Sequence, residues 1–185
     1  MKKIIVLVVT VLVFVACSTV PISGRKRINI VSDGQVLPAS FAQYKGFLEE
    51  NKLSKNKVMG NQIKEVGTNI SGAVDRFMRA NNMNSEADSY QWEFNLIEDK
   101  TVNAWCMPGG KVVFYTGIMP VCANKNGIAA VMGHEVAHAF AKHGQERMTS
   151  SYGQQVGGLL VSLGTSKKDP KTQQIWNTAF GIGSG

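Results

Sequence analysis

Apolar residues recur every three or four positions along two stretches of the first half of the chain, and this spacing predicts two helices. The first covers residues 41–53, with apolar positions at Phe41, Tyr44, Phe47 and Leu48. The second covers about residues 56–80, and its apolar stripe consists of Ile63, Val66, Ile70, Val74, Phe77 and Met78. Such stripes are typical of core packing. The polar segment 81–89 that follows predicts a loop.

The period then changes from that of a helix to that of a strand. Trp92, Phe94 and Leu96 alternate with polar residues, which predicts a strand. Residues 102–107 and 111–116 predict two more strands, and the Pro-Gly-Gly turn at 108–110 joins them into a hairpin over residues 102–116. The chain is expected to leave the sheet at residues 117–120.

The second half of the chain returns to helical patterning. An apolar run over residues 128–141 predicts a helix that Asn124 or Asn126 can cap and that ends near residues 144–147. Residues 156–163 predict a helix weakened by glycines, and Pro170 can begin a last short helix that runs towards Phe180. The sequence therefore predicts an α+β fold, mainly helical, with a small three-stranded sheet beside the helix over residues 128–141.

That helix contains the sequence His134-Glu135-Val136-Ala137-His138. Successive helical residues are rotated by about 100°, so His134 and His138 lie on one face, about one turn apart. Two imidazoles at this spacing can hold one Zn²⁺ through two of its four tetrahedral positions. Glu135 then lies beside the ion and can take a proton from the attacking water. The pattern predicts one zinc ion per chain, with His134 and His138 as metal ligands and Glu135 as catalytic base.

Composition narrows the class of protein. A length of 185 residues suits one domain, and a hydrophobic content of 44% is typical of a globular protein. Twenty basic and thirteen acidic residues give a net charge of +7. The basic run at 25–27 has two interpretations, a solvated cluster or a contact with an anionic membrane surface. No nucleic-acid-binding module is recognisable, so no nucleic-acid partner is expected.

The N-terminus has the pattern of an export signal. Lys2 and Lys3 precede a nearly continuous apolar stretch over residues 4–15, which is too short for a comfortable transmembrane helix. The stretch ends in small and apolar residues before Cys17, which resembles the cleavage site of bacterial lipoproteins. We expect residues 1–16 to be a signal peptide, Cys17 to be lipidated and residues 17–37 to form a tether. Ser18 resembles the pattern that directs lipoproteins to the outer membrane, facing the periplasm.

Cys106 and Cys122 leave two interpretations open. An exported protein enters an oxidising compartment, where the two can form a disulfide. Alternatively, both are buried thiols that pack as small hydrophobic residues.

Two segments together resemble the metallopeptidases of family M48. Residues 103–117 are similar to the strand-turn-strand segment of that family, and residues 134–139 with His143-Gly144 are similar to its zinc helix. The likeness is expected to be nearer to bacterial lipoprotein members than to mitochondrial Oma-type members. It implies a zincin-like domain over residues 38–185. By the same likeness, substrate is expected to bind as an extended strand beside Asn103 and Ala104.

The family also implies a third metal ligand, a glutamate downstream of the two histidines. Glu146 and Asp169 are the only acidic residues after His138. On a continuing helix Glu146 lies about 12 Å along the axis from His138, and Asp169 lies in a predicted loop. His143 is expected about 180° round the same helix from His134. The third ligand is therefore not found, the domain is expected to be C-terminally incomplete, and this chain by itself is expected to bind zinc weakly.

The expected function is zinc-dependent cleavage of peptide bonds in misfolded proteins of the bacterial envelope, with the membrane contacted through the N-terminal lipid. The alternative is a non-catalytic, chaperone-like or scaffold lipoprotein that lacks a complete zinc site.

Overall fold

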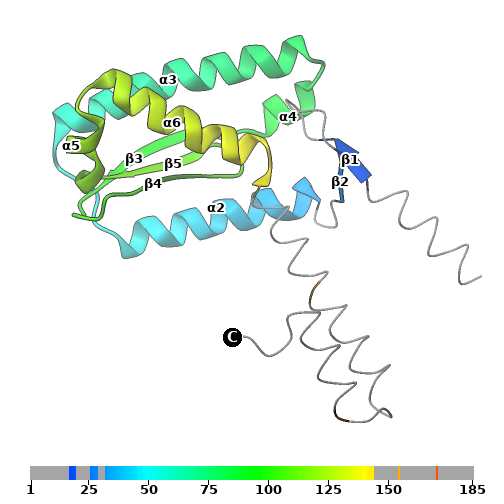
Figure 1. Cartoon of the computed structure of the whole chain (residues 1–185), viewed down its shortest axis with the longest axis horizontal. Helices are drawn as coiled ribbons and strands as arrows, with labels where there is room; N and C mark the ends of the chain where they lie inside the picture. Colours follow the sequence, from blue (N-terminus) through cyan, green and yellow to red (C-terminus); the bar gives the residue numbers. More distant parts are fainter. Residues whose placement is uncertain (1–16, 20–25, 29–31, 144–153, 155–169, 171–185) are drawn as a thin grey trace, which may run out of the picture. The chain divides into compact units, whose positions relative to one another are not determined.

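The computed structural model describes residues 17–19, 26–28 and 32–143, together with Gln154 and Pro170 (Figure 1). Contacts divide the chain into two units, one of which holds residues 32–144. Strands β1 (Cys17–Thr19) and β2 (Lys26–Ile28) belong to the other unit and pair in antiparallel fashion. The expected helices over residues 156–163 and 170–180, and the signal peptide over residues 1–16, lie outside the described residues.

Two long helices open the larger unit. Helix α2 covers Asp33–Glu50 and helix α3 covers Lys57–Ala80. The expected start and end of α3 are confirmed, because the side chain of Asn56 accepts a hydrogen bond from the backbone N–H of Met59 and so caps the helix. The expected start of the first helix at residue 41 was wrong, and α2 occupies the last residues of the predicted tether. Pro38 lies inside α2.

Tertiary contacts explain why α2 continues through Pro38. The hydroxyl of Ser40 donates a hydrogen bond of 2.8 Å to the backbone oxygen of Pro108, in the turn of the hairpin. Gly109 in that turn has φ +84° and lies directly against the ring of Phe41, where a Cβ would collide with ring atoms. These contacts fix the first half of α2 on the sheet, and they join residues that are far apart in the sequence.

The three predicted strands form one mixed sheet with the order β3-β5-β4. Strand β3 (Glu93–Ile97) is parallel to β5 (Lys111–Tyr115), and β4 (Ala104–Met107) pairs with β5 as the antiparallel hairpin that the sequence predicts. Leu53 forms an antiparallel bridge with Ile97, so the outer edge of β3 is partly covered. Strand β4 forms the opposite edge of the sheet.

Helices cover both faces of the sheet, with α3 and α6 (Lys125–Phe140) on one face and α2 on the other (Figure 1). Alternate residues of the strands supply the two cores. The larger core, on the side of α3 and α6, contains Ala104, Val112 and Phe114. The smaller core, on the side of α2, contains Val113 and Tyr44, with Trp105 packed against it. Figure 1 and these clusters support the expected α+β class, a mainly helical domain with a small sheet.

Short helices connect the main elements. The expected loop over residues 81–89 was wrong, because Asn84–Ser89 forms helix α4. Its Ala87 is buried with Met78 and Phe140, which explains why a polar segment becomes ordered there. After β5 the chain turns through a 3₁₀ helix, η1 (Thr116–Ile118), and helix α5 (Met119–Cys122). Within the described residues, no helix combines the length and apolar character needed to cross a bilayer.

Candidate metal centre and catalytic site

Helix α6 presents the His-Glu-x-x-His motif, and its own sequence explains its position. Of the two asparagines that the sequence offers as caps, Asn124 is the one used, and its side-chain oxygen accepts from the backbone N–H groups of Asn126 and Gly127. Ile128, Met132 and Val136 are buried against the rest of the domain. This apolar face fixes the rotation of the helix.

The two histidines of the motif converge on one point outside that apolar face. His134 and His138 are exposed, and their Nε2 atoms lie 3.0 Å apart. Two nitrogen ligands at about 2.0–2.1 Å from a tetrahedral Zn²⁺ lie about 3.3 Å from each other. The side chains present therefore fit two positions on such an ion.

Glu135 is half-buried on α6, the helix that packs against strand β4. Its charge acts on the thiol of Cys106, which belongs to β4. Burial is the main reason that the pKa of Cys106 rises to about 12, and the neighbouring Glu135 carboxylate adds to the effect. Cys106 therefore stays a neutral thiol at physiological pH.

The edge of the sheet beside α6 carries the two residues expected to contact substrate. Asn103 is exposed at the start of β4 and its carbonyl accepts from the backbone N–H of Tyr115, whereas the side chain of Ala104 is buried. Hydrogen-bonded and non-hydrogen-bonded pairs alternate along an antiparallel ladder. Because Asn103 pairs with Tyr115, the backbone groups of Ala104 and Cys106 point away from β5, towards the edge at which no described strand pairs with β4.

The cysteines near this edge are unpaired thiols, and the aromatic residues pack against one another. Cys106 and Cys122 are free thiols, so the disulfide that the sequence left open is not formed in the structure. Trp105 packs edge-on against Phe47, with ring centroids 4.9 Å apart, and its indole N–H donates to the hydroxyl of Tyr115. These contacts show that Trp105 and Tyr115 pack on the side of the sheet that α2 covers.

The expectation for His143 was wrong. Helix α6 ends at Phe140 rather than near residues 144–147, and the backbone of Lys142 adopts a left-handed conformation with φ +58°. The chain therefore turns back, and His143 Nδ1 lies 2.6 Å from His138 Nδ1. Glycine usually occupies such a helix-ending position. Because lysine occupies it here, the sequence carried no signal for the early end.

His143 nevertheless is not a third ligand for the same ion. It contacts Nδ1 of His138, the ring nitrogen opposite to the one that faces His134. Among the residues that the structure describes, no group of three or more His, Cys, Asp or Glu side chains is arranged to hold a metal. Glu146 and Asp169, the acidic residues considered for that role, lie outside the described residues.

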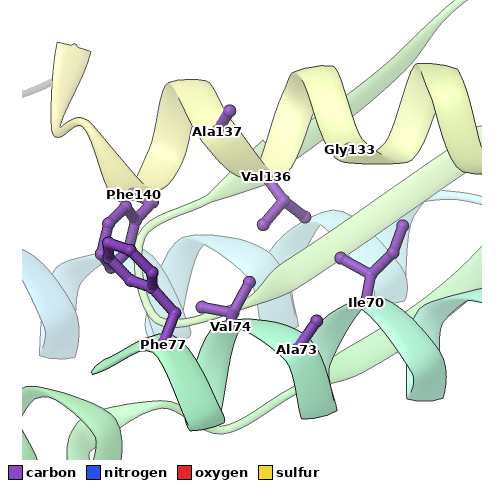
Figure 2. Close-up of a pocket in the computed structure, with 8 residues that line it drawn as sticks. All are labelled: Ile70, Ala73, Val74, Phe77, Gly133, Val136, Ala137 and Phe140. Carbon is purple, nitrogen blue, oxygen red and sulfur yellow. The ribbon is translucent and has the colours of Figure 1, made fainter. Parts of the chain in front are cut away.

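An apolar cavity of about 280 Å³ lies between α3 and α6 (Figure 2). None of the three motif residues lines it. Its walls come from two helices: Ile70, Ala73, Val74 and Phe77 from α3, and Gly133, Val136, Ala137 and Phe140 from α6.

Comparisons with known proteins support the resemblance to metallopeptidases that the motifs indicated. Residues 67–181 match the sequence model of peptidase family M48. The mitochondrial metalloendopeptidase OMA1 of Schizosaccharomyces pombe is 35% identical over 130 residues, and that of Saccharomyces cerevisiae is 31% identical over 146 residues. The metalloprotease YcaL of Escherichia coli is 32% identical over 95 residues.

The alignments cover 70%, 76% and 50% of this chain, respectively. The chain itself spans only 36%, 42% and 35% of the length of these relatives. The mitochondrial proteins of the two yeasts thus match over more of the chain than the bacterial protein does. The motifs predicted a nearer likeness to the bacterial lipoprotein members, and these alignments give the opposite order.

Proposed function

This chain belongs to peptidase family M48, and from that premise we propose that it is a zinc-dependent endopeptidase. The observation that carries the proposal is the convergence of His134 and His138 on the exposed face of α6, with Glu135 near enough to strand β4 for its charge to act on Cys106. Three of the relatives above are named as metalloendopeptidases or metalloproteases, which supports the same reaction class.

The described side chains have distinct roles in this proposal. His134 and His138 bind the ion through Nε2. A bound Zn²⁺ supplies Lewis acidity, which polarises the scissile carbonyl and lowers the pKa of a water molecule towards about 7. Glu135 accepts a proton from the attacking water and passes it to the leaving amine. Glu135 is half-buried and follows His134 directly on α6, the helix that packs against β4, which suits this role.

Substrate binds in an extended conformation along β4. The outward backbone groups of Ala104 and Cys106 form main-chain hydrogen bonds with it, as an added strand does at a sheet edge. Asn103 lies at the end of that edge. Main-chain pairing reads side chains weakly, so this mode of binding suits unfolded segments of varied sequence.

The Glu135→Gln substitution tests the proposed reaction. We expect the full-length protein, as the cell produces it, to contain one Zn²⁺ and to cleave an unfolded protein such as casein. The Glu135→Gln variant should retain the zinc and lose about 100-fold or more in rate, because a general base contributes about that much. Glu50→Gln, an exposed glutamate at the end of α2, serves as the matched control and should keep full activity.

Two results would contradict the proposal. Equal cleavage by the wild-type protein and Glu135→Gln would remove Glu135 from the reaction. Binding of unfolded protein without any cleavage, by a protein that contains no zinc, would support the chaperone-like or scaffold function instead.

We further propose that the protein acts in the bacterial envelope, anchored by lipid at Cys17, on misfolded proteins exposed to the periplasm. The support lies in the sequence: an apolar stretch over residues 4–15 ends directly before Cys17, and Ser18 follows it. Similarity to these relatives does not indicate the cellular compartment of this protein, because they include mitochondrial and Escherichia coli proteins. Multiple acyl chains on one cysteine would anchor the protein firmly, since each buried CH₂ contributes about 0.8 kcal/mol.

Replacement of Cys17 tests the anchor. In a bacterium that processes lipoproteins, the wild-type protein should incorporate labelled fatty acid and sediment with outer membranes. Cys17→Ser should lose the label and remain unprocessed or leave the membrane fraction, whereas Ser18→Ala should keep the label. Unchanged labelling and membrane retention of Cys17→Ser would rule out lipidation at this residue.

A further inference from the structure

The turn after α6 places a third histidine against the pair in the motif. His138 Nδ1 lies 2.6 Å from Nδ1 of His143, while His138 Nε2 lies 3.0 Å from Nε2 of His134. The two nitrogens of an imidazole ring point away from each other. The ring of His138 is therefore held between the other two histidines, one on each side.

Contacts with α3 and α4 fix the segment that carries His143. Phe140 is only 3% exposed and packs edge-on against Phe77 of α3, with ring centroids 5.9 Å apart (Figure 2). Lys142 Nζ lies 2.8 Å from Oε1 of Glu86 in α4, and the two side chains are only 15% and 21% exposed. These contacts hold the end of α6 and the turned-back residue Lys142, so the position of His143 is set before any ligand binds.

The single proton of a neutral His138 can serve only one of its two contacts. A neutral imidazole has one N–H donor and one acceptor nitrogen. With the proton on Nδ1, His138 donates to His143, and its Nε2 keeps a lone pair on the side of His134. With the proton on Nε2, His138 donates to His134 instead, and the nitrogen on that side has no lone pair for a metal ion.

We propose that His143 is a positioning residue: its Nδ1 accepts a hydrogen bond from the Nδ1–H of His138 and so keeps the Nε2 of His138 unprotonated and directed at the metal position. This inference rests on the proposed zinc function for its purpose, but the contact between the two rings is present in the structure without a metal ion. Ligating histidines generally donate their other ring N–H to a fixed acceptor, and loss of such an acceptor lowers metal affinity about 10–100-fold.

The tautomer of His138 in the metal-free protein provides a direct test. The printed sequence contains three histidines, so their ring ¹⁵N resonances can be assigned by single substitutions. At about pH 8, where an unperturbed imidazole is neutral, we expect His138 to carry its proton on Nδ1 in the wild-type protein. A His138 that carries its proton on Nε2 would overturn the proposal, whether or not the protein binds zinc or cleaves peptides.

Two substitutions at His143 separate hydrogen bonding from packing. His143→Phe fills similar space without an acceptor. It should shift His138 towards the Nε2–H form and weaken Zn²⁺ binding, measured by competition with a chelator, about 10–100-fold. His143→Gln retains an acceptor oxygen and should restore the Nδ1–H form and most of the affinity. An unchanged tautomer in His143→Phe, or equal losses of affinity in both variants, would assign His143 a packing role only and overturn the proposal.

A control and a coupled substitution complete the design. Asn124→Ala weakens the same helix at its other end and should leave the tautomer of His138 unchanged. Lys142→Met removes the ion pair with Glu86 and should reduce zinc affinity in the same direction as His143→Phe. The effects of Lys142→Met and His143→Phe should not add in the double variant, because both act through one hydrogen bond. Fully additive effects would show that Lys142 does not act through His143.

Discussion

Lys111, the first residue of β5, is a buried cation on the face of the sheet that α2 covers. Its surroundings show how individual residues stabilise this fold. Its side chain is 7% exposed, and its Nζ lies 3.7 Å from Oε1 of Glu93. The same Nζ lies 5.0 Å from the ring centre of Phe41 and 5.7 Å from that of Tyr44. Attraction to aromatic faces and to a carboxylate offsets part of the free energy needed to bury the charge. Lys111 thereby helps to hold α2 on the sheet.

Tyr44, in the same cluster, should make stability depend on pH in alkali. Burial raises the pKa of its phenol to about 12; a hydrogen bond from Asn95 opposes that rise and the charge of Glu93 adds to it. The folded state thus favours the neutral phenol. This contribution to the free energy of unfolding is fully present below about pH 10 and is lost as the pH rises through about 12.

Tyr44→Phe should therefore be less stable than the wild-type protein at pH 7, by about 1 kcal/mol for the lost hydrogen bond. The difference should shrink between pH 10 and about 12, because phenylalanine does not ionise. Urea denaturation at a series of pH values measures both quantities. A difference that stays constant over this range would show that the phenol of Tyr44 titrates normally in the folded protein.

At the scale of elements, helix α6 carries the site, and its two ends are fixed by different means. Its start depends on a local cap, the side chain of Asn124, which accepts hydrogen bonds of 2.9 and 3.2 Å from the next turn. Its end depends on distant residues: Phe140 packs with Met78 and Ala87, and Lys142 pairs with Glu86. The motif lies between these ends, so its orientation follows from both.

Asn124→Ala should lower the free energy of unfolding by about 1 kcal/mol, because two backbone N–H groups lose their acceptor. Asn124→Ser should recover most of that loss, since a hydroxyl oxygen can also accept at this position. Asn126→Ala is the matched control two residues further on and should be nearly neutral. Chemical denaturation measures all three variants, and equal losses at Asn124 and Asn126 would show that neither side chain acts as a specific cap.

At the scale of the whole domain, one edge of the sheet is partly covered, and among the described residues no strand pairs with the other edge. The backbone N–H of Ser54 donates to the carbonyl of Leu96 in β3, which helps to cover that edge. Strand β4 forms the other edge, and α6 lies against β4. In the proposed mode of binding, this asymmetry favours addition of a substrate strand at β4, the strand against which the helix with Glu135 and the two histidines packs.

Peptide substrates methylated on backbone nitrogen should reveal this pairing. Methyl groups on the alternate substrate residues whose N–H groups face β4 remove hydrogen bonds to that strand and should lower kcat/KM about 10-fold or more per site. Methyl groups on the intervening substrate residues should have little effect. Cleavage of a peptide series in which one methyl group moves by one residue at a time measures the pattern. A uniform effect at every position would contradict strand addition.

The sequence by itself determined the features that depend on local periodicity and local chemistry. The apolar stripe of α3, the alternation in β3 and the Pro-Gly-Gly turn between β4 and β5 predicted those elements correctly. The spacing of His134 and His138 predicted their shared helical face, because four residues make about one turn of any helix. Each of these signals comes from residues that are neighbours in the chain, and packing did not override them.

Only the tertiary structure decided where several elements begin and end and what they pair with. Helix α2 starts before Pro38 because Ser40 and Phe41 contact the hairpin turn at residues 108–109. Helix α4 forms, and α6 ends at Phe140, because the buried cluster of Met78, Ala87 and Phe140 joins three segments. The parallel pairing of β3 with β5 likewise joins strands that are not consecutive, because β4 lies between them in the sequence. In each case the stabilising partner lies far away in the sequence, so the position of His143 beside His138 followed from packing rather than from periodicity.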